Sequence, residues 1–252
     1  MGHEEDAHHR TRLLVGDEGT DRLKRAHVAV FGLGGVGSYA FEALVRSGIG
    51  KILAVDADTV TASNLNRQLV ALQDTLGRPK VEVARERALA INPSVQVDAR
   101  RVFVYANNID DLLNADLDYA IDAIDTLEPK ISLLIALQQR SIKTVSCMGA
   151  ARRLDPCGIQ VADISHTQGC PLARRVRRAL RTAGIGQGIQ CVYSKGPIVP
   201  DRDESDTVPL KNGERRPFGS ISYVPGLIGL TAAGIVIQHL VMSRMNQELS
   251  GP

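Results

Sequence analysis

Paired cysteines are missing from this chain. The four cysteines, Cys147, Cys157, Cys170 and Cys191, lie far apart, and no two of them form a C-x-x-C pair. Structural zinc sites and disulfide frameworks require close, regular spacing, so we expect no zinc, no disulfides and a reducing, cytoplasmic environment. We expect the four cysteines to be buried structural thiols. Cys170 is the strongest candidate for a reactive thiol, because it directly precedes a predicted helix.

The chain also lacks an excess of charge of either sign. It has 30 Lys and Arg against 28 Asp and Glu, a formal net charge of only +2. No global field therefore attracts a polyanion, and stable DNA binding is not expected, although local basic stretches can still bind nucleic acid.

The start of the chain has no apolar core of the kind found in secretory signals. Residues 1–10, MGHEEDAHHR, are predicted to form a flexible tail. One apolar run, residues 221–242, approaches the ~20 residues that span a bilayer. Its many small and polar residues favour a helix buried against a sheet, with membrane association as the alternative.

The chain does contain a regular alternation of short β-rich runs and longer helical stretches, which is typical of a mostly parallel sheet with helices on both faces. Strands are predicted at 27–31, 51–56, 95–104, 119–123 and 143–147, with helices at 35–47, 77–91 and 129–140. In the second half, strands at 158–164 and 190–193 are expected to extend the sheet in antiparallel fashion. The charged, proline-containing segment 199–217 is predicted to be a mobile loop. We expect a single α/β domain over residues 1–252.

A glycine-rich turn follows the first predicted strand in the run VAVFGLGGVGS. Gly32, Gly34, Gly35 and Gly37 would let backbone amides approach the phosphates of a nucleotide at the start of the next helix. Asp56 ends the second strand 19 residues after Gly37, close to the ~20 expected of a ribose-binding acid. Close packing of helix on strand also favours glycine, but the position between strand and helix predicts a Rossmann-like nucleotide site.

A polar string, DADTVTASNLNRQ, follows the second strand, and Lys80 lies beyond it. Asp58 is expected to support a metal ion or the loop backbone, with the capping of a turn as the alternative. Asn64, Arg67 and Gln68 are too polar for a core, and Arg67 can bind phosphate oxygens through two N–H groups, with Lys80 as a counter-charge to pyrophosphate. A dehydrogenase needs no such cluster. The pattern predicts an enzyme that cuts ATP between its α and β phosphates to activate a carboxylate.

Two acids lie at the end of the fourth predicted strand, in YAIDAID. This is the carboxyl edge, where open α/β sheets bind ligands. We assign Asp125 to hold Mg²⁺ against the triphosphate, where the ion would neutralise developing charge, and we expect Asp122 to support the loop or the start of the next helix.

GLGGVGS, VDADTV, SNLNRQ, GRPKVE and DAID occur in an order and spacing that resemble the ThiF/MoeB superfamily of ubiquitin-activating-like adenylating enzymes. The resemblance covers nearly the whole chain. It implies ATP and Mg²⁺ as cofactors, Asp56 on the ribose, Arg67 and Lys80 on the phosphates, and Asp125 on the magnesium. It also implies that Arg12, in RTRLLVG, is donated across the interface of a homodimer.

Within that superfamily, DISHTQGCPLARRVRRALR and CVYSKGP are similar to segments of the tRNA threonylcarbamoyladenosine dehydratases. This resemblance implies ATP-dependent dehydration, by cyclisation, of threonylcarbamoyladenosine in tRNA through an acyl adenylate. Two residues depart from the pattern. Cys170 stands where aspartate is common, and Phe218 lies near the place where some members carry a cysteine.

Three other functions stay open at this stage. The first is activation of the C-terminus of a ubiquitin-like sulfur-carrier protein, which would bring in a sulfur-transfer protein as partner, although paired C-x-x-C motifs are missing. The second is a NAD-binding redox protein, which would retain NAD and consume no ATP. The third is a binding module that holds ATP without turnover.

The predicted helix at 171–181 is strongly basic, with Arg174, Arg177, Arg178 and Arg181 at helical spacing and no acid among them. A charge run is often only a solvated face, but a tRNA substrate favours contact with RNA phosphates. Arg152 and Arg153 are expected to extend this basic track.

Overall fold

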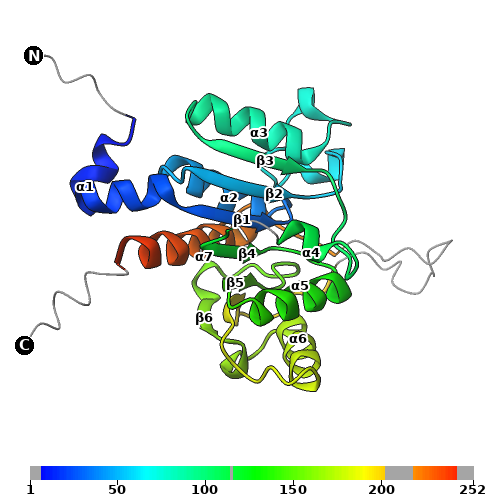
Figure 1. Cartoon of the computed structure of the whole chain (residues 1–252). Coiled ribbons are helices and arrows are strands. Elements are labelled where there is room, and N and C mark those ends of the chain that lie inside the picture. The colour runs from blue at the N-terminus through cyan, green and yellow to red at the C-terminus, as the bar shows by residue number, and fades with distance from the viewer. Residues whose placement is uncertain (1–6, 114–115, 202–217, 243–252) are drawn as a thin grey trace, which may run out of the picture.

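The computed structural model describes residues 7–113, 116–201 and 218–242, and in these ranges seven strands form one sheet (Figure 1). The strand order is β3-β2-β1-β4-β5-β7-β6. The strands are β1 (His27–Phe31), β2 (Lys51–Val55), β3 (Gln96–Arg100), β4 (Tyr119–Asp122), β5 (Lys143–Cys147), β6 (Ile159–Asp163) and β7 (Gln190–Ser194). The predicted α/β, Rossmann-like class is confirmed.

The C-terminal half extends the sheet by one parallel and one antiparallel strand. β7 pairs in parallel with β5, and β6 then pairs antiparallel with β7 at the edge. The predicted antiparallel extension is therefore confirmed for β6, whereas β7 continues the parallel part of the sheet.

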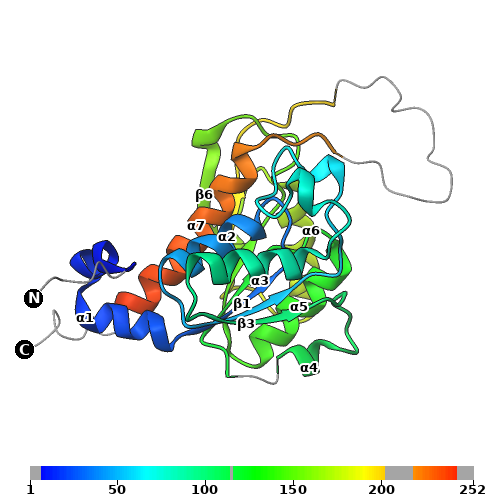
Figure 2. The same ribbon diagram turned by 90° about the horizontal axis from the view of Figure 1, so that it is seen from above.

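Helices cover both faces of the sheet (Figures 1 and 2). The helices on one face are α2 (Gly37–Arg46), α3 (Lys80–Ile91) and α7 (Tyr223–Met242), and those on the other are α4 (Ile109–Leu112), α5 (Leu127–Gln139) and α6 (Pro171–Thr182). Along β1, Val28 and Val30 join the core under α2, whereas Ala29 and Phe31 join the core under α5. Burial on both faces explains why this strand is apolar at nearly every position.

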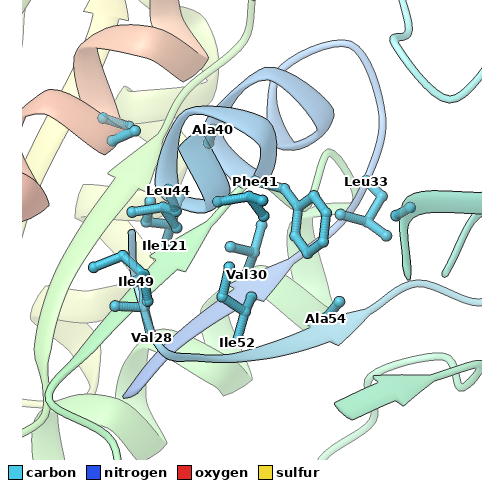
Figure 3. Close-up of a cluster of buried hydrophobic side chains, with 14 of the residues drawn as sticks. Val28, Val30, Leu33, Ala40, Phe41, Leu44, Ile49, Ile52, Ala54 and Ile121 are labelled. Atoms are coloured by element: carbon cyan, nitrogen blue, oxygen red, sulfur yellow. The ribbon is translucent and has the colours of Figure 1, made fainter. Parts of the chain in front are cut away.

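The core under α2 is built from side chains of that helix and of the central strands (Figure 3). Phe41 and Leu44 of α2 lie in one cluster with Val30 and Ile52 of the sheet, and each of these residues is at most 3% exposed. This packing fixes the position of the α2 N-terminus relative to the ends of β1 and β2.

α7 is the helix predicted within the apolar run 221–242. By length and composition alone it could cross a membrane. In this structure it packs along α2 and against the sheet, with Val224, Ile228 and Ala232 fully buried. A Cβ on Gly229 would lie 2.2 Å from the carbonyl oxygen of Val36, so glycine permits this close approach of the two helices.

The N-terminal prediction needs a partial correction. Of the predicted tail, residues 1–6 lie outside the described ranges, but His9 and Arg10 belong to α1 (His9–Arg25), which packs on α7. Gly16, with φ of 73°, breaks α1 into two helical segments. Most of the predicted loop at 199–217 lies outside the described residues.

A buried ion pair lies at the end of β4. Lys130 of α5 donates to Asp122 at 2.7 Å and to the carbonyl of Ile124 at 2.9 Å, and both charged side chains are fully buried. Asp122 also accepts from the Ser146 hydroxyl at 2.6 Å and from the backbone N–H of Ile124 at 3.1 Å. The pair therefore shapes the loop that leaves β4, as expected of a loop-supporting Asp122.

We predict that Lys130→Met lowers the free energy of unfolding by about 3–5 kcal/mol, because it leaves the Asp122 carboxylate buried without a counter-charge. Urea denaturation measures this loss. The matched control is Lys51→Met at the exposed start of β2, which should change stability by less than about 0.5 kcal/mol. Equal stability of the two variants would contradict the importance of the pair.

Candidate active site

The glycine turn lies where the strand order reverses, between the carboxyl ends of β1 and β4. Gly32 has φ of +89°, and a Cβ there would lie 2.8 Å from the carbonyl oxygen of Ala123. A Cβ on Gly37 would lie 1.7 Å from the carbonyl oxygen of Gly32. These two positions accept only glycine, and the loops after β1 and β4 meet here. Crevices of this kind are where open α/β sheets bind ligands.

The start of α2 presents backbone N–H groups to this crevice. No side chain caps the N-terminus of α2 in the described structure. Uncapped N–H groups and the positive end of the helix dipole favour an anion such as a phosphate. Gly34 and Gly35 form the outer part of the turn and are both partly exposed.

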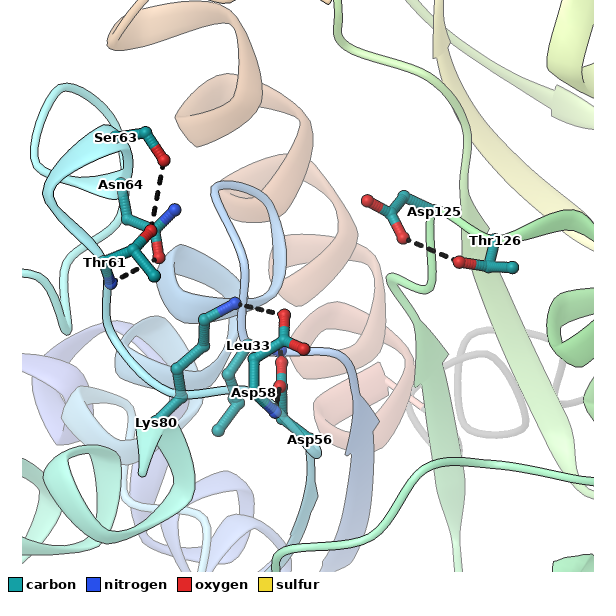
Figure 4. A network of polar contacts seen from close by, with 9 residues as sticks. All are labelled: Leu33, Asp56, Asp58, Thr61, Ser63, Asn64, Lys80, Asp125 and Thr126. Carbon is teal, nitrogen blue, oxygen red and sulfur yellow. Dashed lines mark hydrogen bonds and ion pairs between the residues drawn. The ribbon is translucent and has the colours of Figure 1, made fainter. Parts of the chain in front are cut away.

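Asp56 joins the end of β2 to the glycine turn (Figure 4). Its carboxylate accepts from the N–H of Leu33 at 2.6 Å and from the N–H of Asp58 at 2.8 Å. Burial raises the pKa of Asp56, while the nearby Lys80 charge and these two hydrogen bonds oppose that rise. The carboxylate is therefore held beside the turn, in the position of an acceptor for ribose hydroxyls.

Lys80 begins α3 and is only 4% exposed. Its ammonium group lies 2.7 Å from the Asp58 carboxylate, and its N–H donates to the Asp58 carbonyl at 3.0 Å. Asp58 therefore positions a buried cation next to Asp56 and the glycine turn (Figure 4). Of the roles predicted for Asp58, the geometry favours support of this loop.

The polar string folds back over the glycine turn. A Cβ on Gly35 would lie 3.2 Å from Cγ of Arg67, and one on Gly34 would lie 3.8 Å from Nε2 of Gln68. Arg67 donates from Nη1 to the Ser63 carbonyl at 2.8 Å and to the Asn66 side chain at 2.9 Å. In the described part of the chain Nη2 and Nε have no partner.

Gln68 is buried, yet its Oε1 has no hydrogen-bond partner among the described residues. A buried unpaired acceptor next to a glycine turn fits a site that is completed by a ligand. Asn64 has a different role from Gln68. Its Oδ1 accepts from the N–H of Thr61 at 3.2 Å and caps the short helix η1 (Ala62–Asn64), so its observed contact is structural (Figure 4).

Asp125 lies across the crevice from Lys80, in the loop after β4 (Figure 4). It is exposed, and its one observed hydrogen bond is from the Thr126 hydroxyl at 3.3 Å. No group of three or more His, Cys, Asp or Glu suited to a metal ion occurs in the described ranges. One carboxylate suffices for Mg²⁺ when phosphates and water supply the other ligands, so Asp125 fits that ion.

Arg12 lies elsewhere. α1 occupies the end of the molecule opposite the carboxyl edge of the sheet, as both views show (Figures 1 and 2). Within the described chain Arg12 forms a 3.5 Å ion pair with Asp17. The structure therefore brings together every predicted nucleotide residue except Arg12, which could reach an active site only in a second copy of the chain.

α6 carries the predicted basic face, with one correction. Arg174, Arg178 and Arg181 are exposed. Arg177 instead donates to the carbonyl and the hydroxyl of Thr167, at 2.7 and 2.6 Å, and so anchors the helix. These four arginines and Thr182 line a shallow surface recess.

The predicted extension of the basic track is also corrected. Arg153 is only 4% exposed, and it donates to the Gly169 carbonyl at 2.8 Å, which removes it from the surface. Arg152 contacts Val199 and Asp201 before residues 202–217, and its N–H donates to the Gly219 carbonyl after them.

Three of the four cysteines are buried as predicted, whereas Cys157 is exposed. Burial raises the pKa of Cys147 to about 12 and also raises the pKa of Cys191, so neither is a thiolate near neutral pH. The Cys170 thiol caps α6 by accepting from the N–H of Ala173 at 3.5 Å. This contact gives Cys170 a structural role.

Three contributors escaped the sequence analysis. The buried Ser38 hydroxyl accepts from the N–H of Leu69 at 3.1 Å and ties α2 to the polar string. The Asn66 side chain donates to the Ser220 carbonyl at 3.0 Å, and Lys130 supports the Asp125 loop from below. Asn66 stands within the SNLNRQ motif, which was a usable signal, whereas Ser38 and Lys130 act through tertiary contacts that no local pattern marks.

Comparison with known proteins gives a consistent result. The ThiF family model matches residues 8–250. A tRNA threonylcarbamoyladenosine dehydratase of Bacillus subtilis is 43% identical over 92% of this chain and 93% of its own length. The crystal structure of the Escherichia coli tRNA N6-threonylcarbamoyladenosine dehydratase in complex with ATP is 34% identical, has a TM-score of 0.84, and matches 94% of this chain and 95% of that one.

Another relative matches only about half of the chain. A sulfur carrier protein adenylyltransferase of Thermus thermophilus is 41% identical, but over 48% of this chain and 45% of its own length. The family model and the full-length relatives agree with the glycine turn and the polar string seen in the structure. The chain belongs to the ThiF family.

Proposed function

We propose that this protein is an ATP-dependent tRNA threonylcarbamoyladenosine dehydratase that acts through an acyl adenylate. The observation that carries the proposal is the folding of Arg67 and Gln68 over the glycine turn at the strand-order reversal. A NAD-binding redox site needs only the turn and the ribose acid. The added cation next to the phosphate position fits cleavage of ATP, and the 43% identity to a full-length dehydratase supports the substrate.

The chemistry begins with a carboxylate, which is a poor electrophile. One oxygen of the threonyl carboxylate attacks the α-phosphorus of ATP, and the bond from that phosphorus to pyrophosphate breaks. Arg67 would bind the α-phosphate oxygens as their charge grows, and Lys80 would offset the charge of the departing pyrophosphate. Asp125 would hold Mg²⁺, which lowers the barrier by neutralising phosphate charge.

Ring closure follows without an enzyme nucleophile. The carbamoyl group attacks the activated carbonyl carbon of the same side chain and expels AMP. The substrate thereby loses the elements of water, because one carboxylate oxygen leaves with AMP and the protons are released. A well-oriented intramolecular reaction has an effective molarity on the order of 10⁵ M or more. The burial of Cys147, Cys170 and Cys191 agrees with this route.

We predict that Arg67→Ala and Asp125→Ala each lower the rate of tRNA-dependent pyrophosphate release by at least about 10²-fold, because each removes charge stabilisation from the transition state. The matched control is Arg101→Ala, which removes an exposed arginine near the end of β3. Circular dichroism should show that all three variants fold. Pyrophosphate release at the wild-type rate in either site variant would refute the assignment.

The tRNA is proposed to contact the exposed face of α6. α6 contains no acidic residue that would offset the charge of Arg174, Arg178 and Arg181. The recess on its surface is lined by guanidinium groups. A small-molecule enzyme has no need of such a face, whereas RNA phosphates match it in charge.

We predict that the double variant Arg174→Glu/Arg178→Glu weakens tRNA binding and lowers the slope of log affinity against log salt by at least about 1 to 2, because two phosphate contacts are lost. Filter binding at several salt concentrations measures both quantities. Arg85→Glu, at an exposed position on α3, is the matched control. An unchanged slope of log affinity against log salt in the double variant would contradict this proposal and indicate that the α6 face is only a solvated surface.

A homodimer is the proposed assembly, because Arg12 lies far from the crevice of its own chain and the family resemblance implies that this arginine is donated across a dimer interface. A tRNA substrate and ATP consumption support a cytoplasmic location. Magnesium, the dimer and this location are parts of the same proposal.

Activation of a sulfur-carrier protein is the second candidate, favoured by the 41% identity over about half the chain. Pyrophosphate exchange that depends on a carrier protein rather than on modified tRNA would establish it. A sulfur-transfer protein as partner stays a prediction from the sequence.

A further inference from the structure

The surroundings of Phe218 are not used by the mechanism above. The Phe218 ring is 64% exposed in a chain with only 4 Phe, 5 Tyr and no Trp. The Arg152 guanidinium carbon lies 5.9 Å from the ring centroid. Leu154 and Ile198, which are 48% and 44% exposed, lie in the segments that border Arg152 and Val199. Exposed apolar residues in neighbouring segments, next to a charged group, are candidates for a contact site.

The backbone around Phe218 is fixed by several hydrogen bonds. Arg152 adopts a left-handed conformation with φ of 60°, which is unusual for a residue other than glycine. Its N–H donates to the Gly219 carbonyl at 2.8 Å, and its carbonyl accepts from the N–H of Val199 at 2.9 Å. The Asp201 carboxylate accepts from the N–H of Gly219 at 2.9 Å. Strained conformations persist where the surroundings hold them, and they cluster at functional sites.

Hydrogen bonds connect the segments around Phe218 both to the candidate ATP site and to the start of the basic helix. Two residues after Phe218, the Ser220 carbonyl accepts from Asn66, the neighbour of Arg67. In the other direction, Arg153 donates to the Gly169 carbonyl, just before α6 begins at Pro171. A nucleic acid that contacts α6 and brings a carboxylate to Arg67 would extend over these connected segments.

We propose that Phe218 is a stacking platform for an unpaired base of the tRNA loop that carries the modified adenosine, with Arg152 as the positioning residue for the ring. This inference rests on the proposed function. Proteins recognise single-stranded RNA loops by stacking splayed bases on aromatic rings, and every base offers a π face. The guanidinium group adds a positive charge beside the ring, which suits the neighbouring phosphates.

The test measures binding of a fluorescent anticodon stem-loop RNA by anisotropy, with the full-length protein and its Phe218 variants. Phe218→Ala should weaken binding by about 5- to 150-fold, the loss of one stacked base. Phe218→Trp should bind within about twofold of the wild type, and Phe218→Leu should bind nearly as weakly as the alanine variant, because leucine is apolar but offers no flat face. Ile198→Ala, at an exposed aliphatic residue next to Val199, is the matched control.

Two further readouts separate stacking from other roles. The slope of affinity against salt should be unchanged in Phe218→Ala, because no phosphate contact is lost, and ATP affinity should also be unchanged. Wild-type binding by Phe218→Leu would overturn the proposal, because it would indicate plain apolar packing of the kind that a residue makes against a protein partner. Wild-type RNA binding and dehydration by Phe218→Ala would overturn this inference alone. Failure of the unmodified protein to bind the RNA would overturn both this inference and the proposed function.

Discussion

The close approach of the glycine turn to the loop after β4 is the constraint on which the site depends. The Gly37 Cα can approach the Gly32 carbonyl, and Gly32 can approach Ala123, only because neither residue has a Cβ. That contact sets the start of α2 against the ends of β1 and β4. Because the Asp122–Lys130 pair fixes the β4 loop from within, Asp125 is held across the crevice from Lys80 by a rigid structure.

The two basic residues of the crevice, Lys80 and Arg67, differ in how their charges are balanced. Lys80 is neutralised by Asp58, and the same lysine moderates the effect of burial on the pKa of Asp56. Arg67 is held by a carbonyl and an amide oxygen and has no carboxylate partner in the described chain. In the proposed mechanism the arginine would supply the uncompensated positive charge that a triphosphate requires, while the lysine is positioned without the cost of an unpaired buried charge.

Much of this arrangement could be predicted from the sequence, because its signals are local. The glycine spacing, the acid at the end of β2 and the apolar strands follow from backbone geometry and burial on two faces of a sheet. α1 was missed because it is mostly polar, is interrupted at Gly16 and gains its packing from α7, far along the chain. The structural roles of Arg177 and Arg153 were missed for the same reason, since a charged residue that bonds a distant carbonyl has no local mark. The predicted strand at 95–104 ends at Arg100, beyond which the exposed Val102 and Phe103 leave the sheet.

The central claim is that the site activates a carboxylate at the α-phosphorus of ATP. The most direct measurement uses tRNA whose threonylcarbamoyl carboxylate carries ¹⁸O in both oxygens, with mass spectrometry of the nucleotide products after one turnover. Attack at the α-phosphorus must leave one labelled oxygen in AMP and none in pyrophosphate. Label in orthophosphate, with ADP as the nucleotide product, would contradict the account.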